Sequence, residues 1–119
     1  MRKAIVMSAT ISSVLTLAAV WSFGWAPLPT KVVLENEHVR VRQVTYDPGV
    51  PREPSIRPTN QIIVFLDDCR YERTDSATHE KTVRERKAGD VIWHNQGEDA
   101  PQLINLGSKP YRTLVIELK

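Results

Sequence analysis

The strongest constraint on this chain is a period-two alternation of apolar and polar residues that runs from Lys31 to the C-terminus. Turn residues such as Asp47-Pro48-Gly49 and Ala88-Gly89-Asp90 interrupt it about every ten residues. No segment after residue 26 has a helical period. The pattern predicts an all-β protein, an antiparallel sandwich or barrel, with strands at 32–34, 39–46, 61–66, 69–75, 80–87, 91–93, 102–105 and 111–118.

Two of these segments carry further information. Prolines at 48, 51, 54 and 58 predict that 48–60 is a loop outside the hydrogen-bonded ladders, because proline lacks an N–H. The run 61–66 is apolar after its first residue, which predicts a strand buried on both faces.

Residues 1–26 have the composition of an export signal. Arg2 and Lys3 precede an uncharged stretch, residues 4–26. Small residues near Gly24 suit cleavage of a signal peptide, whereas the aromatic residues between 21 and 25 suit the end of an uncleaved membrane anchor. Both alternatives predict a periplasmic or otherwise extracytoplasmic domain. We therefore divide the chain into a signal peptide or anchor (1–26), a spacer (27–31) and a β domain (32–119).

The net charge of the chain comes from this first segment. The whole sequence has 16 Lys and Arg against 14 Asp and Glu, a formal net charge of +2. Without Arg2 and Lys3 the basic and acidic residues are equal in number. Balanced charge does not favour nucleic acid as a partner, so any charge important for function must be local.

The segment from Arg70 to Lys87 alternates basic and acidic residues on both faces of a predicted hairpin. Only Tyr71 and Val83 could reach a core. We expect a solvated ribbon, with a partner-binding arm as the alternative. The single cysteine, Cys69, allows no intramolecular disulfide and is expected to be buried and inert.

Two stretches resemble the sequence motifs of the cupin superfamily. The first is YDPG at 46–49 with the proline loop and buried strand after it, and the second is KAGDVIW at 87–93. The likeness extends over about residues 32–119. It implies a small, antiparallel, double-stranded β-barrel of jelly-roll type. Cupins include metal-dependent oxygenases, isomerases and sugar epimerases.

The metal-ligand positions of the two cupin motifs are occupied by other residues here. Counted from Gly49, the positions for His, His and Glu hold Ser55, Arg57 and Gln61, and the second motif has Ala100 in place of its His. Metals such as Mn, Fe, Ni and Zn need imidazole or carboxylate ligands, whereas an arginine is permanently cationic. We therefore expect no metal and no other cofactor in this domain.

A metal-free pocket is the hypothesis that remains. Arg57 would occupy the former metal corner and present its guanidinium to a carboxylate or phosphate, and Gln61 and His94 would add hydrogen bonds. In the alternative, Arg57 points to solvent and side chains fill the barrel interior.

Some cupin epimerases work without metal through a His–Asp pair and a Tyr, and His94, Asp99 and Tyr46 are present here. The main prediction is nevertheless a non-catalytic domain that binds a small anion or sugar or assists assembly, and that can pair with a second copy through sheet faces. The runner-up is a metal-free isomerase or epimerase that acts on a small acid or sugar.

Overall fold

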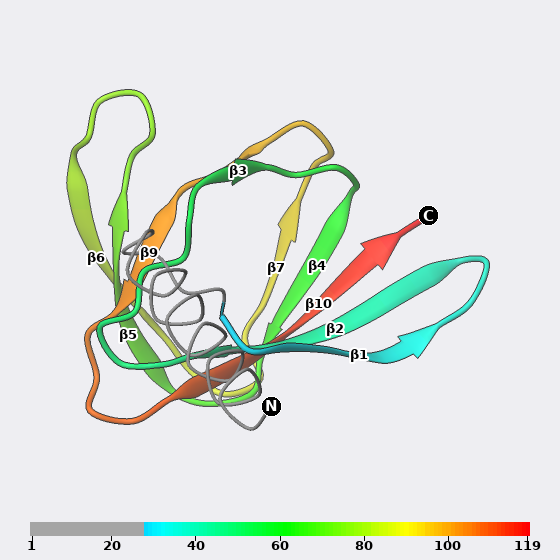
Figure 1. Cartoon of the computed structure of the whole chain (residues 1–119), viewed down its shortest axis with the longest axis horizontal. Coiled ribbons are helices and arrows are strands. Elements are labelled where there is room, and N and C mark those ends of the chain that lie inside the picture. Colours follow the sequence, from blue (N-terminus) through cyan, green and yellow to red (C-terminus); the bar gives the residue numbers. More distant parts are fainter. Residues whose placement is uncertain (1–27) are drawn as a thin grey trace, which may run out of the picture.

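The computed structural model describes residues 28–119 (Figure 1), and the predicted export segment at 1–26 lies outside the described residues. No helix long and apolar enough to cross a membrane occurs in 28–119. The described chain consists of ten strands: β1 (Thr30–Glu35), β2 (Val39–Tyr46), β3 (Ser55–Ile56), β4 (Gln61–Phe65), β5 (Cys69–Thr74), β6 (Lys81–Arg86), β7 (Val91–His94), β8 (Asp99–Ala100), β9 (Gln102–Asn105) and β10 (Tyr111–Leu118).

These strands form two main sheets and a short two-stranded one. The larger sheet has the order β1-β2-β10-β4-β7, the smaller has the order β6-β5-β9, and β3 pairs with β8. Every ladder is antiparallel, as predicted. Figure 1 shows the two main sheets converging at one end and diverging at the other, where β3 runs across the gap.

The barrel is not closed, in contrast to the sequence prediction. Only isolated bridges, Pro48 with Asn105 and Arg52 with Leu103, join the segment after β2 to β9. The prolines of 48–60 explain this, because a segment that lacks so many N–H groups cannot form a continuous ladder. The same segment does contribute the two residues of β3, which the prediction of a pure loop missed.

The strand predictions from alternation agree closely elsewhere. β2, β9 and β10 have the predicted bounds, and the other main strands differ by a few residues at their ends. β1 begins at Thr30, inside the segment that we assigned to a spacer.

The prediction that β4 is buried on both faces is only half right. Gln61, Ile63 and Phe65 are buried, whereas Ile62 and Val64 are partly exposed because no described element covers that side of the sheet.

The apolar core lies between the sheets and is rich in aromatic rings. Tyr46 and Tyr111 are register partners on β2 and β10, and their rings stack with centroids 4.6 Å apart. Phe65 and Tyr71 extend this group, with centroids 6.4 Å apart. Tyr71 belongs to the smaller sheet, so the aromatic cluster joins the two sheets.

The outer face of the larger sheet is also apolar. One register row crosses all five strands and consists of Leu34, Val41, Ile116, Ile62 and Trp93. The two ends of the row are about half exposed, with Leu34 at 53% and Trp93 at 50%. The sequence predicts that two copies can pair through a sheet face. That prediction refers to this apolar outer face.

The β5–β6 hairpin differs from the predicted solvated ribbon. Tyr71 is 5% exposed and belongs to the core, but Val83 is 47% exposed, so its predicted burial is wrong. The register pairs Tyr71 with Arg84 and Val83 with Glu72, which puts Val83 on the opposite face from Tyr71. One face of the hairpin therefore turns toward the interior, and it carries arginines.

Asn105, at the end of β9, fastens the smaller sheet to the larger one. Its side-chain Nδ2 donates to the backbone oxygens of Tyr46 and Lys109, both at 2.8 Å. Its Oδ1 accepts from the N–H of Gly107 at 2.8 Å, and its backbone oxygen accepts from Gly49. The residue is 3% exposed, so these groups have little access to water.

We predict that Asn105→Ala lowers the free energy of unfolding by about 3 kcal/mol, because it leaves buried carbonyls without their donor. Urea denaturation followed by tryptophan fluorescence measures the loss. Ser108→Ala, in the exposed turn that follows, is the matched control and should be neutral within about 0.5 kcal/mol. A variant as stable as the control would show that Asn105 does not hold the sheets together.

Candidate functional site

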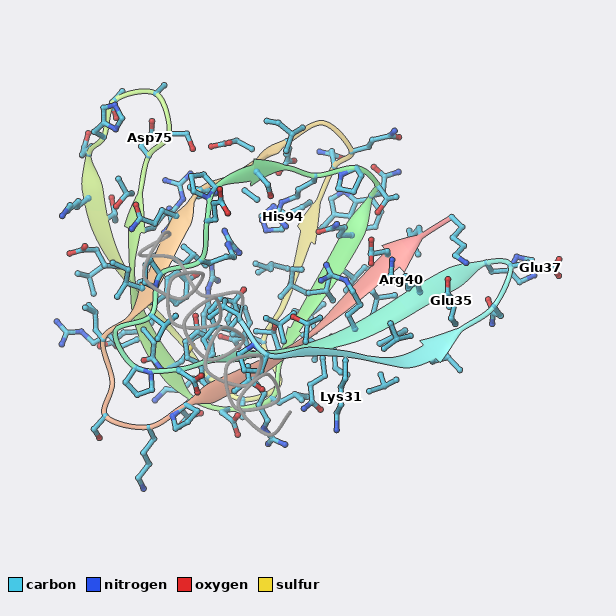
Figure 2. All side chains as sticks on the ribbon, in the orientation of Figure 1. Lys31, Glu35, Glu37, Arg40, Asp75 and His94 are labelled. Carbon is cyan, nitrogen blue, oxygen red and sulfur yellow. The ribbon has the colours of Figure 1, made fainter. Side chains whose placement is uncertain are left out.

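A cavity of about 590 Å³ lies between the two sheets. The inner face of the larger sheet forms one wall, the β5–β6 hairpin forms another, and the segment from 51 to 58 closes a third side. Figure 2 shows His94 in the space between the sheets, whereas Glu37 and Asp75 lie at the tips of the two projecting hairpins. Interior volume of this size is typical of a small-molecule site.

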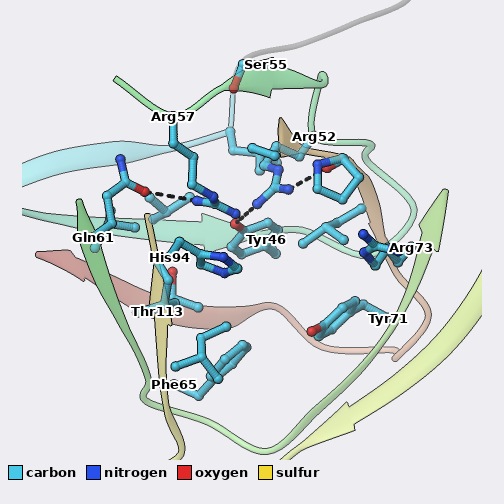
Figure 3. A pocket seen from close by; sticks show the side chains of 18 of the residues that line it. Tyr46, Arg52, Ser55, Arg57, Gln61, Phe65, Tyr71, Arg73, His94 and Thr113 are labelled. Atoms are coloured by element: carbon cyan, nitrogen blue, oxygen red, sulfur yellow. Dashed lines mark hydrogen bonds between the residues drawn. The ribbon is translucent and has the colours of Figure 1, made fainter. Parts of the chain in front are cut away.

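Arg57 is the most buried cation of the cavity. Its backbone is fixed on both sides, since its N–H donates to the oxygen of Glu98 at 2.9 Å and its oxygen accepts from Gly97 at 2.9 Å. The side chain is directed into the cavity, where Nη1 donates to Oε1 of Gln61 at 2.9 Å (Figure 3). Gln61 is in turn the register partner of His94 on β7. The structure thus brings Arg57, Gln61 and His94 together on one wall.

No carboxylate of residues 28–119 forms an ion pair with the guanidinium of Arg57, although the charges of Glu98 and Asp99 lie near enough to favour its charged form. The residue is only 9% exposed, and its Nε has no hydrogen-bond partner. Burial and the nearby Arg52 lower the pKa of Arg57 below its usual value, although an arginine stays charged. A buried cation without an anion is unfavourable, and a bound anion would relieve this cost.

Arg52 lies beside Arg57 at the same end of the cavity. Its Nη1 donates to the hydroxyl of Tyr46 at 3.2 Å, and its Nη2 donates to the backbone oxygen of Pro101. Its Nε, like that of Arg57, is buried without a partner. Neutral oxygens therefore position Arg52 but do not balance its charge.

A second group of arginines lines the wall formed by β5 and β6. Arg73 is half-buried, Arg84 is exposed and Arg86 is half-buried. Arg86 stacks over the ring of Phe65, with its guanidinium carbon 5.7 Å from the ring centroid, and donates to the hydroxyl of Tyr71 at 3.4 Å.

The arginines without a carboxylate partner are found at the cavity, which paired Arg42 also lines. Four arginines of residues 28–119 lie within 4.0 Å of a carboxylate, namely Arg40, Arg42, Arg70 and Arg112. The other five have no carboxylate partner in this part of the chain, and all of them line the cavity: Arg52, Arg57, Arg73, Arg84 and Arg86. Glu53 is the only Asp or Glu among the lining residues. The described domain balances its total charge but gathers its unpaired arginines at one place.

Two hydroxyls of the inner face also lack partners. Tyr111 Oη and Thr113 Oγ1 are buried, have no hydrogen bond in the described structure, and belong to residues that are 2% exposed and line the cavity. Buried hydroxyls are normally paired. These two are therefore available to a bound molecule.

His94 forms a pair with a carboxylate, which is Glu98 and not the Asp99 that the metal-free epimerase alternative would use. Its Nδ1 lies 2.9 Å from Oε2 of Glu98. Asp99 is exposed and pairs with Ile56 in the short sheet. The reason is the tight turn after β7, in which the N–H of Asn95 donates to Oε1 of Glu98 at 3.0 Å and so directs that carboxylate toward the ring.

The four positions that the motif count assigned to metal ligands all line the same cavity, namely Ser55, Arg57, Gln61 and Ala100. Ser55 and Ala100 are register partners in the β3–β8 pair. By contrast, His38 and His79 are exposed and lie outside it. Sequence reasoning missed Arg52, Arg73, Arg84 and Arg86, because a charged loop and a hairpin of mixed charge do not show which face turns inward.

These four residues do not suit a metal ion. They offer one hydroxyl, one amide oxygen that already accepts from Arg57, one methyl group and a fixed positive charge. Within residues 28–119, no cluster of three or more His, Cys, Asp or Glu has an arrangement that could hold a metal. The chemistry of these side chains therefore fits an anion better than a cation.

No family model matches the chain, and no curated protein matches it in sequence. Solved structures do resemble it. A cupin domain from Bordetella pertussis Tohama I superposes with a TM-score of 0.69 and 16% identity, over 80% of this chain and 96% of that one. A double-stranded β-helix protein from Klebsiella pneumoniae gives 0.60 and 20% identity, over 78% and 77%.

The polyketide cyclase RemF from Streptomyces resistomycificus gives a TM-score of 0.64 at 13% identity, over 80% of this chain and 67% of that one. An oxalate decarboxylase also matches, with a TM-score of 0.57. The fold of this domain is a cupin fold. Since proteins of such different activity share it, the fold alone does not select a function.

We predict that Glu98→Gln changes the acid stability of the domain. The N–H of Asn95 and the side chain of His94 lower the pKa of Glu98 from 4.5 to about 2. The ionised carboxylate thus contributes stability above about pH 4.5, and this contribution is lost as the pH falls through 2. The melting temperature of the parent should exceed that of Glu98→Gln at pH 6, and the difference should shrink between pH 4.5 and 2. Other carboxylates are common to both proteins and cancel, so a difference that stays constant would contradict the prediction.

Proposed function

We propose that this cupin-fold domain is a metal-free binding module for a small organic anion. The observation that carries the proposal is that five arginines without a carboxylate partner in the described chain all line one cavity.

The export signature of residues 1–26 supports a location outside the cytoplasm. Mass spectrometry of the mature N-terminus tests that location.

The charge of the cavity favours an acid over a sugar. A carboxylate can accept two parallel hydrogen bonds from one guanidinium, and such charge-assisted bonds are stronger than neutral ones. An uncharged sugar could bond to Gln61 or Thr113, but it would leave Arg52 and Arg57 unbalanced. The proposed ligand therefore carries at least one carboxylate or phosphate.

The remaining lining favours a ligand with a flat apolar body. The rings of Tyr46 and Tyr111 are nearly parallel, with an interplanar angle of 4°, and Ile63, Phe65 and Leu103 line the space around them. An aromatic or conjugated acid would bury its ring against these side chains and its anion against Arg57.

We predict that benzoate and cinnamate bind the parent protein and that Arg57→Gln weakens both by about 30-fold or more, because the variant removes a buried charge partner. Isothermal titration calorimetry at pH 7 measures the affinities, with acetate and glucose as comparison ligands. Arg70→Gln is the matched control, since Arg70 is exposed, pairs with Glu85 and does not line the cavity. Equal affinity of Arg57→Gln and the parent would refute this role of Arg57.

The His94–Glu98 pair favours a second candidate, a metal-free enzyme of the isomerase or epimerase type. A carboxylate that holds one imidazole nitrogen orients the ring, and the other nitrogen can then exchange a proton with a ligand. The ring is 24% exposed at the side chain and lines the cavity together with Tyr46, a potential second proton donor.

If this second function holds, the protein catalyses exchange of a carbon-bound proton of a bound acid. Proton NMR in D2O with racemic mandelate as the probe measures that exchange. His94→Asn should abolish it without weakening mandelate binding more than about threefold, since Arg57 remains. Absence of exchange above the solvent rate in the parent would leave the binding module as the function.

A further inference from the structure

We infer that the ligand carries two anionic groups at opposite ends of an apolar body, one bound by Arg57 and Arg52 and the other by Arg73 and Arg84. This inference rests on the proposed function, because it names the chemical class of ligand for the same cavity.

The two pairs of arginines come from different parts of the fold and differ in exposure. Arg52 and Arg57 belong to the segment between β2 and β4, and the Arg57 side chain is almost fully buried. Arg73 on β5 is half-buried, and Arg84 on β6 is exposed. The first pair forms an inner position, and the second forms an outer position where the cavity meets solvent.

The two positions are too separate for one small anion. Figure 3 shows Arg57 and Gln61 on one side of the cavity and Arg73 on the other, with Tyr46 between them. Arg52 and Arg57 lie at the inner end of the cavity, whereas Arg73 and Arg84 come from the β5–β6 hairpin that forms another wall. One carboxylate at the inner position therefore leaves the outer cations unbalanced.

The outer position consists of two arginines and not three. The guanidinium of Arg86 already lies over Phe65 and donates to Tyr71. Arg73 and Arg84 line the cavity with no hydrogen bond or ion pair from their side chains to any described residue. Arg84 is the register partner of Tyr71, which places it on the inner face beside the aromatic cluster.

The surface between the two positions suits a rigid, flat connector. Tyr46 lies between them and stacks with Tyr111, and the hydroxyls of Tyr111 and Thr113, which line the same cavity, have no partner among the described residues. A planar diacid could bury its body against these rings while each end meets a pair of guanidinium groups. The chemistry of the cavity thus favours a conjugated or aromatic dianion over a monoacid of the same size.

The test compares matched probes that differ in one carboxylate. The short pair is benzoate and terephthalate, and the long pair is biphenyl-4-carboxylate and biphenyl-4,4'-dicarboxylate. For at least one pair, calorimetry at pH 7 should show the diacid binding about tenfold more tightly than the monoacid, because of the added charge-assisted bonds.

Variants assign the preference to its residues. Arg73→Gln and Arg84→Gln should each reduce the diacid preference to threefold or less, because each variant weakens the diacid more than the monoacid. Arg57→Gln should weaken both members of each pair. Arg70→Gln again serves as the control, because it removes a neighbouring surface arginine that lies outside the cavity.

The outcomes separate the inference from the function on which it rests. If monoacids bind through Arg57 but neither diacid binds more tightly, the dianion inference is wrong and the binding module stands. If Arg73→Gln weakens monoacid and diacid equally, there is no separate outer position and the inference is also wrong. If no probe binds the parent protein, the proposed function falls and the inference falls with it.

Discussion

The guanidinium of Arg57 has lost most of its water without gaining a carboxylate, and the surrounding structure is arranged to keep it there. Its backbone is clamped between Gly97 and Glu98, and its side chain is held by Gln61. The hydrogen bond to Gln61 and the more distant charges of Glu98 and Asp99 offset only part of the cost of the buried charge, and Arg52 adds a second cation. A fold that retains such a group trades stability for a site complementary to an anion.

The incomplete barrel makes that site accessible. The prolines between 48 and 58 prevent a ladder from forming across the gap, so the two sheets are joined by the aromatic cluster and by Asn105 rather than by a closed ring of strands. The segment that cannot form a strand is the one that carries Arg52 and Arg57. The same proline-rich sequence therefore opens the interior and supplies the cations that line it.

Alternation in the sequence was sufficient to predict β9 and β10 and the antiparallel all-β fold, because period-two burial follows from strand geometry alone. The motif spacing was sufficient to predict that Arg57 and Gln61 line the same pocket. Alternation could not show which face of the β5–β6 hairpin turns inward, so Val83 was predicted as core and Arg73 and Arg84 were missed. That choice depends on packing of Tyr71 against Phe65, a contact between two different sheets.

An arginine at a position that the motif count assigns to a cupin metal ligand has a consequence for chemistry as well as for binding. A metal ion at this position of a cupin attracts anions and also activates them as a Lewis acid, whereas a guanidinium attracts them through charge and hydrogen bonds and offers no open coordination position. Any proton transfer in this cavity would therefore have to come from protein side chains, of which the His94–Glu98 pair has a suitable geometry. Binding requires only the arginines, while catalysis requires that pair in addition, so the two candidate functions differ by the role of one imidazole.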